Sequence, residues 1–204
     1  MYEKIFKRSF DFIIAFLGLV MFSPIFFLAM LVLAISNRGK VFFTQERPGK
    51  GEKIFRVIKF CSMNNSRDVD GNLLPDHKRL TPIGRFIRST SFDELPQLIN
   101  VLKGDMSLIG PRPLLIRYLI FYTEREKHRH FVRPGITGLA QISGRNNLNW
   151  DSKLELDVCY VEDITFVGDI KILWKTFVKV IKREGTIADK KENYFDVERY
   201  NKIK

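Results

Sequence analysis

The feature that most constrains this chain is an unbroken apolar segment near its N-terminus. From Phe12 to Ser36 the sequence FIIAFLGLVMFSPIFFLAMLVLAIS contains no charged residue. About twenty consecutive apolar residues are enough to cross the hydrocarbon core of a bilayer, so we expect this segment to enter a membrane. The run is too long for a cleavable signal peptide, and no small-residue cleavage site follows it. The rest of the chain is therefore expected to fold beside a membrane.

The flanks and the midpoint of this segment indicate how it enters. Basic residues on both sides favour the cytoplasmic side for both ends. At the midpoint lie Ser23 and Pro24, and proline removes a backbone donor and kinks a helix. We therefore predict a reentrant helix that bends and returns on the same face. The alternative is a single spanning helix with a proline kink. The flanking basic residues are Lys4, Lys7, Arg8, Arg38, Lys40, Arg47 and Lys50.

The charge balance limits the class of partner. Lysine and arginine number 34 against 23 acidic residues, a net charge of +11, which implies nucleic acid, anionic lipid or a phosphorylated substrate. No zinc-finger spacing, RNA-binding aromatic motif or basic-region heptad occurs, so nucleic acid is the weakest of the three. Cys61 and Cys159 form no CxxC pair, and we expect no disulfide framework. The pair His128 and His130 is interpreted as lying on the surface.

Beyond the apolar segment the pattern predicts a mixed fold. Residues 41–47 and 54–60 flank a turn at 48–51, which indicates a β-hairpin. Its side chains Arg56 and Lys59 are either solvated or available to a phosphate. Segment 114–122 is either a core helix or one lying on the membrane. The helix near 169–181 carries aromatic residues opposite lysines, so it is either interfacial or packed on the core. The charged tail after Glu184 is expected to be loosely held. Other helices are predicted at 81–88, 95–103 and 151–163.

Two adjacent acids, Asp93 and Glu94, lie in the stretch SFDELPQL at residues 91–98. Ser91 and Glu94 have the spacing of a helix capping box, whereas Pro96 could instead be the first helical residue. Both interpretations put the two acids at the N-terminal end of a helix, where the dipole favours them. Taken alone, such a stretch is more often a cap than a catalytic pair.

The surroundings of these acids are suited to phosphate. Arg88 precedes Asp93 closely, and a cation there favours an ionised carboxylate. Arg112 stands between two prolines, which stiffen the backbone and aim the guanidinium for bidentate binding. The stretch RPGITGLAQISGRN at 133–146 spaces three glycines, which lets backbone N–H groups approach an anion. The alternatives are a rigid connector and an ordinary glycine-containing loop.

Together these motifs resemble the bacterial sugar transferase family, the small membrane-associated phosphoglycosyl transferases. The sequence departs from the family pattern after Phe60, where Cys61 and Ser62 replace an arginine and a threonine. A reentrant helix with a Ser–Pro break is also a family feature and matches Ser23 and Pro24. The matching stretches are KRSFD at 7–11, VFFTQERPGKGEKIFRVIKF at 41–60, LTPIGRFIRSTSFDELPQLINVLKGDMSLIGPRPL at 80–114, RPGITGLAQISGRN at 133–146 and LELDVCYVED at 154–163.

The resemblance implies a specific reaction. Asp93, with Glu94, attacks the sugar-proximal phosphate of a UDP-sugar with Mg²⁺ bound to both acids. UMP leaves, a phosphosugar–aspartate intermediate forms, and undecaprenyl phosphate accepts the phosphosugar. UDP-N,N'-diacetylbacillosamine is the expected donor, for N-linked glycoprotein assembly. Asp157 is implied to organise the basic residues or the metal. The residues implied to contact the diphosphate and nucleotide are Lys59, Arg88, Arg112, Gln141 and Arg145.

We therefore predict a predominantly helical α+β fold with a reentrant membrane helix, amphipathic interfacial helices and a small β-hairpin. Residues 1–37 would form the membrane helix-break-helix, 38–185 a cytoplasmic catalytic domain and 186–204 a charged tail. The expected location is the cytoplasmic face of the bacterial inner membrane. Membrane lipids and downstream glycosyltransferases are further expected partners, and nucleic acid is not. The alternatives are another UDP-hexose or UDP-HexNAc donor for polysaccharide synthesis, a transferase that releases UDP, a nucleic-acid binder, and a membrane adaptor without turnover.

Overall fold

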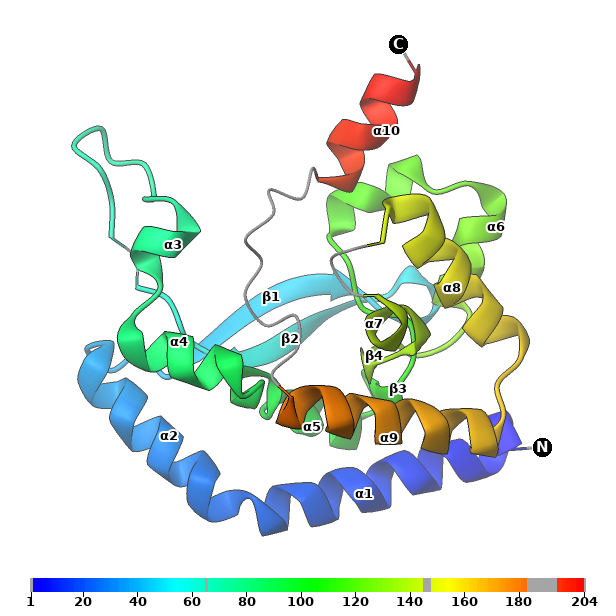
Figure 1. Ribbon diagram of the computed structural model, residues 1–204, viewed down its shortest axis with the longest axis horizontal. Helices are drawn as coiled ribbons and strands as arrows, with labels where there is room; N and C mark the ends of the chain where they lie inside the picture. The colour runs from blue at the N-terminus through cyan, green and yellow to red at the C-terminus, as the bar shows by residue number, and fades with distance from the viewer. Residues whose placement is uncertain (1, 65, 145–147, 183–193, 204) are drawn as a thin grey trace.

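The computed structural model describes residues 2–64, 66–144, 148–182 and 194–203. The fold is predominantly helical α+β with small sheets, as the sequence predicted (Figure 1). The helices are α1 (Lys7–Met21), α2 (Ser23–Ser36), α3 (Asp76–Arg79), α4 (Pro82–Ser89), α5 (Gln97–Lys103), α6 (Glu124–Lys127), α7 (Leu139–Ser143), α8 (Trp150–Glu162), α9 (Phe166–Ile181) and α10 (Phe195–Ile203). Shorter helical turns are η1 (Tyr2–Phe6), η2 (Lys50–Glu52), η3 (Phe92–Glu94), η4 (Ile116–Phe121) and η5 (His128–His130). The strands are β1 (Phe42–Pro48), β2 (Ile54–Phe60), β3 (Ser107–Ile109) and β4 (Gly135–Thr137).

The apolar segment forms two helices, α1 and α2, that meet at a bend of 63° (Figure 1). Pro24 lies in the first turn of α2, and the Ser23 hydroxyl donates to the carbonyl oxygen of Val20 at 2.8 Å. Among the described residues no single helix is long and apolar enough to cross a membrane, whereas this bent pair satisfies the same criterion by length and composition. Many of its apolar side chains are exposed, including Phe16, Leu17, Val20, Phe27, Leu28 and Leu31.

The basic residues at the start of α1 bind the rest of the protein. The Lys7 ammonium is buried and pairs with the Asp169 carboxylate of α9 at 2.6 Å. The Arg8 guanidinium donates to the carbonyl oxygens of Val101 and Leu102, at 2.5 and 2.9 Å. Those carbonyls lie in the last turn of α5, where a cation is favoured. These two side chains therefore fix α1 to the domain, which is not the membrane-flank contact assigned to them from sequence.

The predicted β-hairpin is confirmed. β1 and β2 pair antiparallel from Phe42 opposite Phe60 to Pro48 opposite Ile54. Its two basic side chains have different surroundings. Arg56 is exposed and pairs with Glu46 across the strands at 3.3 Å. Lys59 instead turns towards the acids of residues 93 and 94.

The glycines of residues 135–138 serve close backbone packing. β3 and β4 pair in parallel, and the backbone at Gly110, just after β3, lies directly against the backbone at Gly135 and Gly138. A Cβ atom on Gly135 would lie 2.1 Å from the Gly110 nitrogen, and one on Gly138 would lie 2.2 Å from the Gly110 oxygen. Only glycine fits at such an approach. The expected role of these two glycines in approaching an anion is therefore replaced by a packing role.

The C-terminal helix α10 projects outward and is attached to the domain at its first residue, Phe195 (Figure 1). Phe195 is fully buried and its ring lies 5.3 to 5.4 Å from the rings of Tyr118, Tyr122 and Trp150. The start of this helix, at Phe195, is therefore held by the domain, unlike the loosely held tail expected from the sequence. The same contacts settle segment 114–122, since the η4 residue Tyr118 lies in the core. Aromatic packing of this kind is hard to anticipate because it joins segments distant in sequence.

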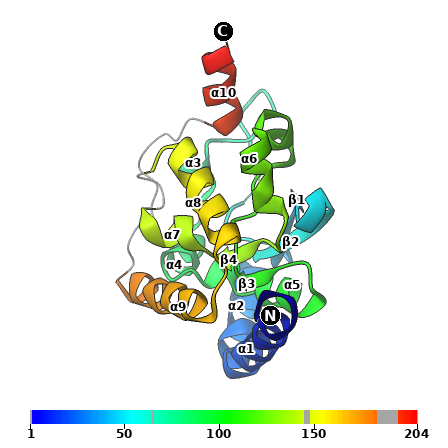
Figure 2. The same ribbon diagram turned by 90° about the vertical axis from the view of Figure 1, so that its right-hand side faces the viewer.

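Helix α9 lies at the same end of the molecule as α1 (Figures 1 and 2). Its Ile172 side chain is buried in the core. Trp174, Phe177 and Ile181, which the sequence placed on an apolar face, are more than half exposed. An ordinary amphipathic helix buries such residues against the core, so this face of α9 is left without a protein partner in the described part of the chain.

Candidate active site

Asp93 and Glu94 lie in the turn η3, between α4 and α5. Ser91 before them adopts a left-handed backbone with φ of 59° and makes no side-chain cap. Helix α5 begins at Gln97, with Pro96 as its N-cap residue. The capping-box interpretation is therefore wrong, because the Glu94 carboxylate binds cations from other segments. The proline alternative places the helix start to within one residue.

Glu94 holds two cations. Its Oε1 atom accepts hydrogen bonds from the Lys59 ammonium at 2.6 Å and from the Arg112 guanidinium at 2.7 Å. Burial alone would raise the pKa of Glu94, but Arg112 and Lys59 together hold that pKa well below its usual range. Glu94 therefore stays ionised at all ordinary pH values. It fixes a lysine from β2 and an arginine from the loop after β3 beside Asp93.

Asp93 differs electrostatically from its neighbour. Burial, and then the negative charge of Glu94, raise its pKa to about 6, although Lys59, Arg88 and Arg112 act in the opposite direction. Within the described residues the Asp93 carboxylate forms no ion pair. Adjacent carboxylates with divergent pKa values are typical of sites where one acid reacts and the other holds neighbouring groups in position. Asp93 is the acid available to react.

Arg88 reaches the site because α4 is well defined at both ends. Thr81 caps α4 by accepting from the Gly84 nitrogen at 2.9 Å, with Pro82 in the first turn. This agrees with the helix predicted for 81–88. A cation near the end of a short helix is also favoured by the helix dipole. Arg88 and Asp93 consequently line the same space.

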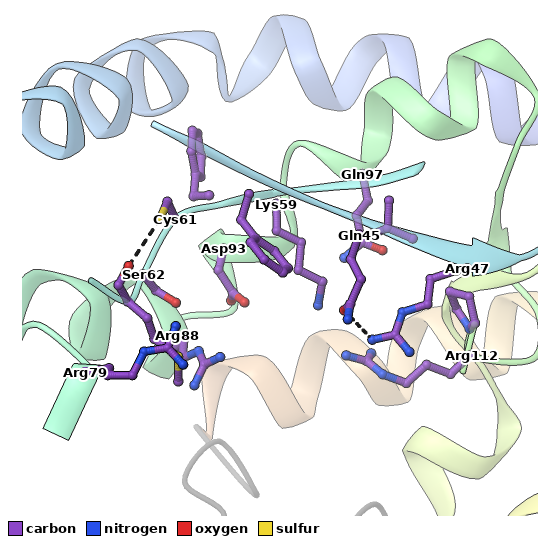
Figure 3. Close-up of a pocket in the computed structure, with 15 residues that line it drawn as sticks. Gln45, Arg47, Lys59, Cys61, Ser62, Arg79, Arg88, Asp93, Gln97 and Arg112 are labelled. Atoms are coloured by element: carbon purple, nitrogen blue, oxygen red, sulfur yellow. Dashed lines mark hydrogen bonds between the residues drawn. The ribbon is translucent and has the colours of Figure 1, made fainter. Parts of the chain in front are cut away.

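Two cavities meet at these side chains. One, of about 390 Å³, lies against the hairpin, and Figure 3 shows Asp93 between Arg88 on one side and Arg112 on the other. The second, of about 600 Å³, lies among α5, α7, α8 and α9. Both volumes are in the range of small-molecule sites. The residues that line both cavities are Lys59, Arg88, Asp93 and Arg112.

The remaining predicted site residues lie in the second cavity or outside the described residues. Gln141 of α7 and Asp157 of α8 line the second cavity. Both side-chain polar atoms of Gln141 are buried without a hydrogen-bond partner in the described part of the protein. Arg145 lies outside the described residues. The structure thus brings Lys59, Arg88 and Arg112 to Asp93, and places Gln141 and Asp157 in the adjoining space.

A buried arginine that the sequence analysis missed supports this arrangement. The Arg129 guanidinium donates to the Asp157 carboxylate at 2.8 Å and to the backbone oxygen of Arg112 at 2.6 Å. It therefore connects α8 to the loop that carries Arg112. Nothing in the local sequence HRHF distinguishes a buried arginine from a solvated one. The surface interpretation is also wrong for His130, which is buried and whose pKa burial lowers to about 4.

Three more cavity residues were not singled out from sequence. Gln45 and Arg47 project from β1 into the first cavity, and Gln97 projects from α5 (Figure 3). Residues 45 and 47 share one face of the strand because side chains alternate with period two. This two-residue spacing is the sequence signal that puts Gln45 and Arg47 on the same side of the hairpin. Gln97 lies within the stretch SFDELPQL, where the pattern predicts only that it belongs to a helix.

A metal ion here would need ligands from a substrate. Among the described residues no group of three or more histidine, cysteine or acidic side chains is placed to hold a metal. Magnesium often uses only one or two carboxylates together with substrate phosphates. Asp93 satisfies that requirement, since its carboxylate lines both cavities and forms no ion pair in the described structure. Glu94 fits less well, because one of its oxygens already binds two cations.

Comparison with known proteins gives consistent matches. A model of the family described as bacterial sugar transferase matches residues 2–183. The uncharacterized sugar transferase EpsL of Bacillus subtilis is 50% identical over 196 residues, covering 96% of each chain. The undecaprenyl-phosphate galactose phosphotransferase of Salmonella typhimurium is 39% identical, over 90% of this chain but 42% of the relative. An Aeromonas hydrophila protein named UDP-N-acetylgalactosamine-undecaprenyl-phosphate N-acetylgalactosaminephosphotransferase is 38% identical, over 88% of this chain and 44% of the relative.

Proposed function

Because this chain belongs to the bacterial sugar transferase family, we propose that it transfers a sugar 1-phosphate from a UDP-sugar to undecaprenyl phosphate and releases UMP. The family relationship makes the chain an enzyme of the sugar-1-phosphate transferase class. One observation carries the proposal furthest. Asp93, with a pKa near 6, lies where two cavities meet among Lys59, Arg88 and Arg112.

In the proposed mechanism Asp93 is the nucleophile. Its carboxylate attacks the sugar-proximal phosphorus, and the acyl phosphate that forms divides one difficult transfer into two easier steps. Phosphoryl transfer depends mainly on positioning and charge neutralisation. Lys59, Arg88 and Arg112 supply that positive charge, and Glu94 keeps two of these cations in place. The lipid phosphate then attacks the same phosphorus and releases Asp93.

We further propose magnesium as the cofactor. The Asp93 carboxylate and the donor phosphates would hold it, with Glu94 contributing mainly through the cations it binds. The ion would neutralise charge on the diphosphate. Lys59, Arg88 and Arg112 perform the same task from the protein side.

We propose that the active site lies beside a membrane. The bent pair α1 and α2 has the composition to enter a bilayer as a reentrant unit formed by residues 1–37. The exposed aromatic face of α9 would then lie at the interface. Residues 38–185 would form the catalytic domain on the cytoplasmic face, and 186–204 the tail, of which α10 is docked. This arrangement supplies undecaprenyl phosphate from the bilayer.

The donor sugar is proposed from the relatives. Their names carry galactose and N-acetylgalactosamine, so we place UDP-galactose and UDP-N-acetylgalactosamine first, for polysaccharide synthesis. UDP-N,N'-diacetylbacillosamine, expected from the sequence resemblance and linked to glycoprotein assembly, is the third donor to test. All three share the diphosphate that the basic residues at Asp93 would bind.

Nucleotide release tests the proposed reaction. The purified protein in detergent, with magnesium and undecaprenyl phosphate, is incubated with each UDP-sugar, and the released nucleotide is identified by chromatography. UMP from one donor supports the proposal. UDP in place of UMP would indicate transfer of the sugar alone. Binding to anionic vesicles with no nucleotide from any donor would indicate a membrane adaptor.

The pKa of Asp93 predicts the pH dependence. A carboxylate nucleophile reacts only when ionised, so the rate of UMP release should fall as pH drops through about 6. Replacing Glu94 by glutamine removes the charge that raises this pKa and frees Lys59 and Arg112 to act on Asp93. We therefore expect the midpoint of the residual activity of Glu94→Gln to move down by about one pH unit. The measurement is kcat/KM against pH for both proteins, and an unchanged or higher midpoint in the variant would contradict this assignment.

A further inference from the structure

The two cavities that meet at Asp93 differ in chemistry. The first is lined by the hairpin, the segment that follows it and α5, and combines amide and cationic side chains with the apolar Phe43 and Phe60. The second, among four helices, has a larger share of apolar surface, beside polar side chains that include Gln141, Lys153 and Asp157. Side chains that line only the first include Gln45, Arg47, Ser62 and Gln97. Side chains that line only the second include Leu95, Leu98, Leu114, Ile136, Leu154 and Val180. Each cavity therefore suits a different part of the substrates.

This inference rests on the proposed function. In that reaction two successive displacements at one phosphorus limit where UMP, the lipid phosphate and the sugar can lie relative to Asp93. In the first step the Asp93 oxygen bonds to phosphorus, and the bond to the UMP oxygen breaks on the opposite side, with UMP leaving with the electron pair. In the second step an oxygen of the lipid phosphate bonds to phosphorus opposite Asp93, and the Asp93–phosphorus bond breaks. UMP and the lipid phosphate therefore use one side of the phosphorus in turn, while the sugar stays where it is.

The position of α9 favours the second cavity as the path of the lipid. Thr176 and Val180 of α9 line the second cavity and not the first. The neighbouring side chains Trp174 and Phe177 are exposed on the same helix, at the end of the molecule occupied by α1 (Figures 1 and 2). A polyprenyl phosphate that comes from a bilayer on that side reaches Asp93 through the second cavity. UMP then leaves through that cavity too.

We propose that the first cavity holds the sugar ring, and that Gln45, Arg47 and Gln97 select the sugar. If UMP and the lipid phosphate occupy the second cavity in turn, the first cavity is the space beside Asp93 that is left for the sugar. Apart from Asp93, its walls offer amide and guanidinium groups, which suit hydroxyl and acetamido oxygens. Phe43 and Phe60 supply apolar surface on the same cavity.

The state of these three side chains supports a ligand. Gln97 is 3% exposed, and its side-chain nitrogen has no hydrogen-bond partner in the described part of the protein. A buried donor without a partner is costly, and a sugar oxygen would satisfy it. Arg47 donates to the Gln45 side-chain oxygen at 2.6 Å and forms no ion pair among the described residues. Figure 3 shows both glutamines and Arg47 directed into the cavity.

Donor selectivity tests this assignment. We would measure kcat/KM for UDP-galactose and UDP-N-acetylgalactosamine, and inhibition by UMP, in the wild type, Gln97→Leu and Gln45→Ala. Leucine keeps the volume of Gln97 and removes its hydrogen bonds, and Gln45 lies on a strand surface where alanine is tolerated. We expect the ratio of the two kcat/KM values to change by about tenfold in either variant, as for a lost hydrogen bond to a substrate. Inhibition by UMP should stay unchanged, which also shows that the variant is folded.

A variant in the second cavity provides the matched comparison. Lys153 lines only that cavity, so Lys153→Met should weaken inhibition by UMP and leave the donor ratio unchanged. The assignment would be overturned if Gln97→Leu and Gln45→Ala slowed both donors equally and weakened UMP inhibition as Lys153→Met does. A wild-type protein that releases no UMP from any donor would instead overturn the proposed function. The two failures are therefore distinguishable.

Discussion

Replacing Asp93 by asparagine is expected to abolish UMP release and to stabilise the protein. The loss of rate should be about 10⁴-fold or more, because the variant has no nucleophile to form the acyl phosphate. The gain in stability follows from the raised pKa. Folding moves that pKa from 3.8 to about 6, so keeping Asp93 ionised in the folded state costs free energy at neutral pH. Removing the charge should raise the free energy of unfolding by about 1–3 kcal/mol at pH 7.5.

The sign of this effect depends on pH. The cost of the ionised Asp93 is fully present above pH 6 and disappears below about pH 4, where the carboxyl is protonated in both folded and unfolded states. Urea denaturation of Asp93→Asn and wild type at pH 7.5 and pH 4 measures it. Asp163→Asn is the matched control, since Asp163 is exposed at the end of α8 and lines neither cavity. Full activity in Asp93→Asn would contradict the assignment of the nucleophile.

The second large effect is expected at Arg129. The side chains of Arg129 and Asp157 are 2% and 6% exposed. Replacing Arg129 by methionine leaves the Asp157 charge buried without its cation, and it removes the donor that holds the backbone of Arg112. We expect the free energy of unfolding to fall by about 3–5 kcal/mol and kcat/KM to fall as Arg112 loses its position. Urea denaturation and the UMP-release assay measure the two effects.

A double variant separates the two roles of Arg129. Arg129→Met combined with Asp157→Leu removes both charges, so much of the lost stability should return, while activity stays low because the Arg112 carbonyl remains unsupported. Arg125→Met is the control, because Arg125 forms exposed pairs with Glu155 and Glu162 and such pairs contribute about 1 kcal/mol or less. If the double variant recovered full activity, the positioning role of Arg129 would be refuted.

Local patterns predicted the elements that local physics determines. The hairpin follows from alternating residues around a glycine turn, and α4 from a threonine cap and a proline in its first turn. The bend between α1 and α2 follows from Ser23 and Pro24. Asp93 was placed correctly at the entry to a helix, because both interpretations of SFDELPQL gave that position. These features need only neighbours in sequence.

Contacts between distant segments could not be predicted in the same way. Lys7 meets Asp169, and Arg129 meets Asp157, across many intervening residues. Phe195 is buried by aromatic rings from η4 and α8. The charged composition around Phe195 does not indicate this contact, because the partner rings are distant in sequence. Likewise, Gly135 and Gly138 pack against the backbone of Gly110. Gly110 is distant in sequence, so this contact becomes visible only in the fold.

A single experiment tests the central claim, that Asp93 carries the phosphosugar between donor and lipid. The protein is incubated with the active UDP-sugar and magnesium in the absence of undecaprenyl phosphate, quenched in acid, and analysed by intact and peptide mass spectrometry. We expect one equivalent of UMP per protein and an added sugar phosphate on the peptide that contains Asp93. We also expect no adduct in Asp93→Asn. Release of UMP only when the lipid is present, with no adduct at any time, would contradict this claim and indicate direct transfer.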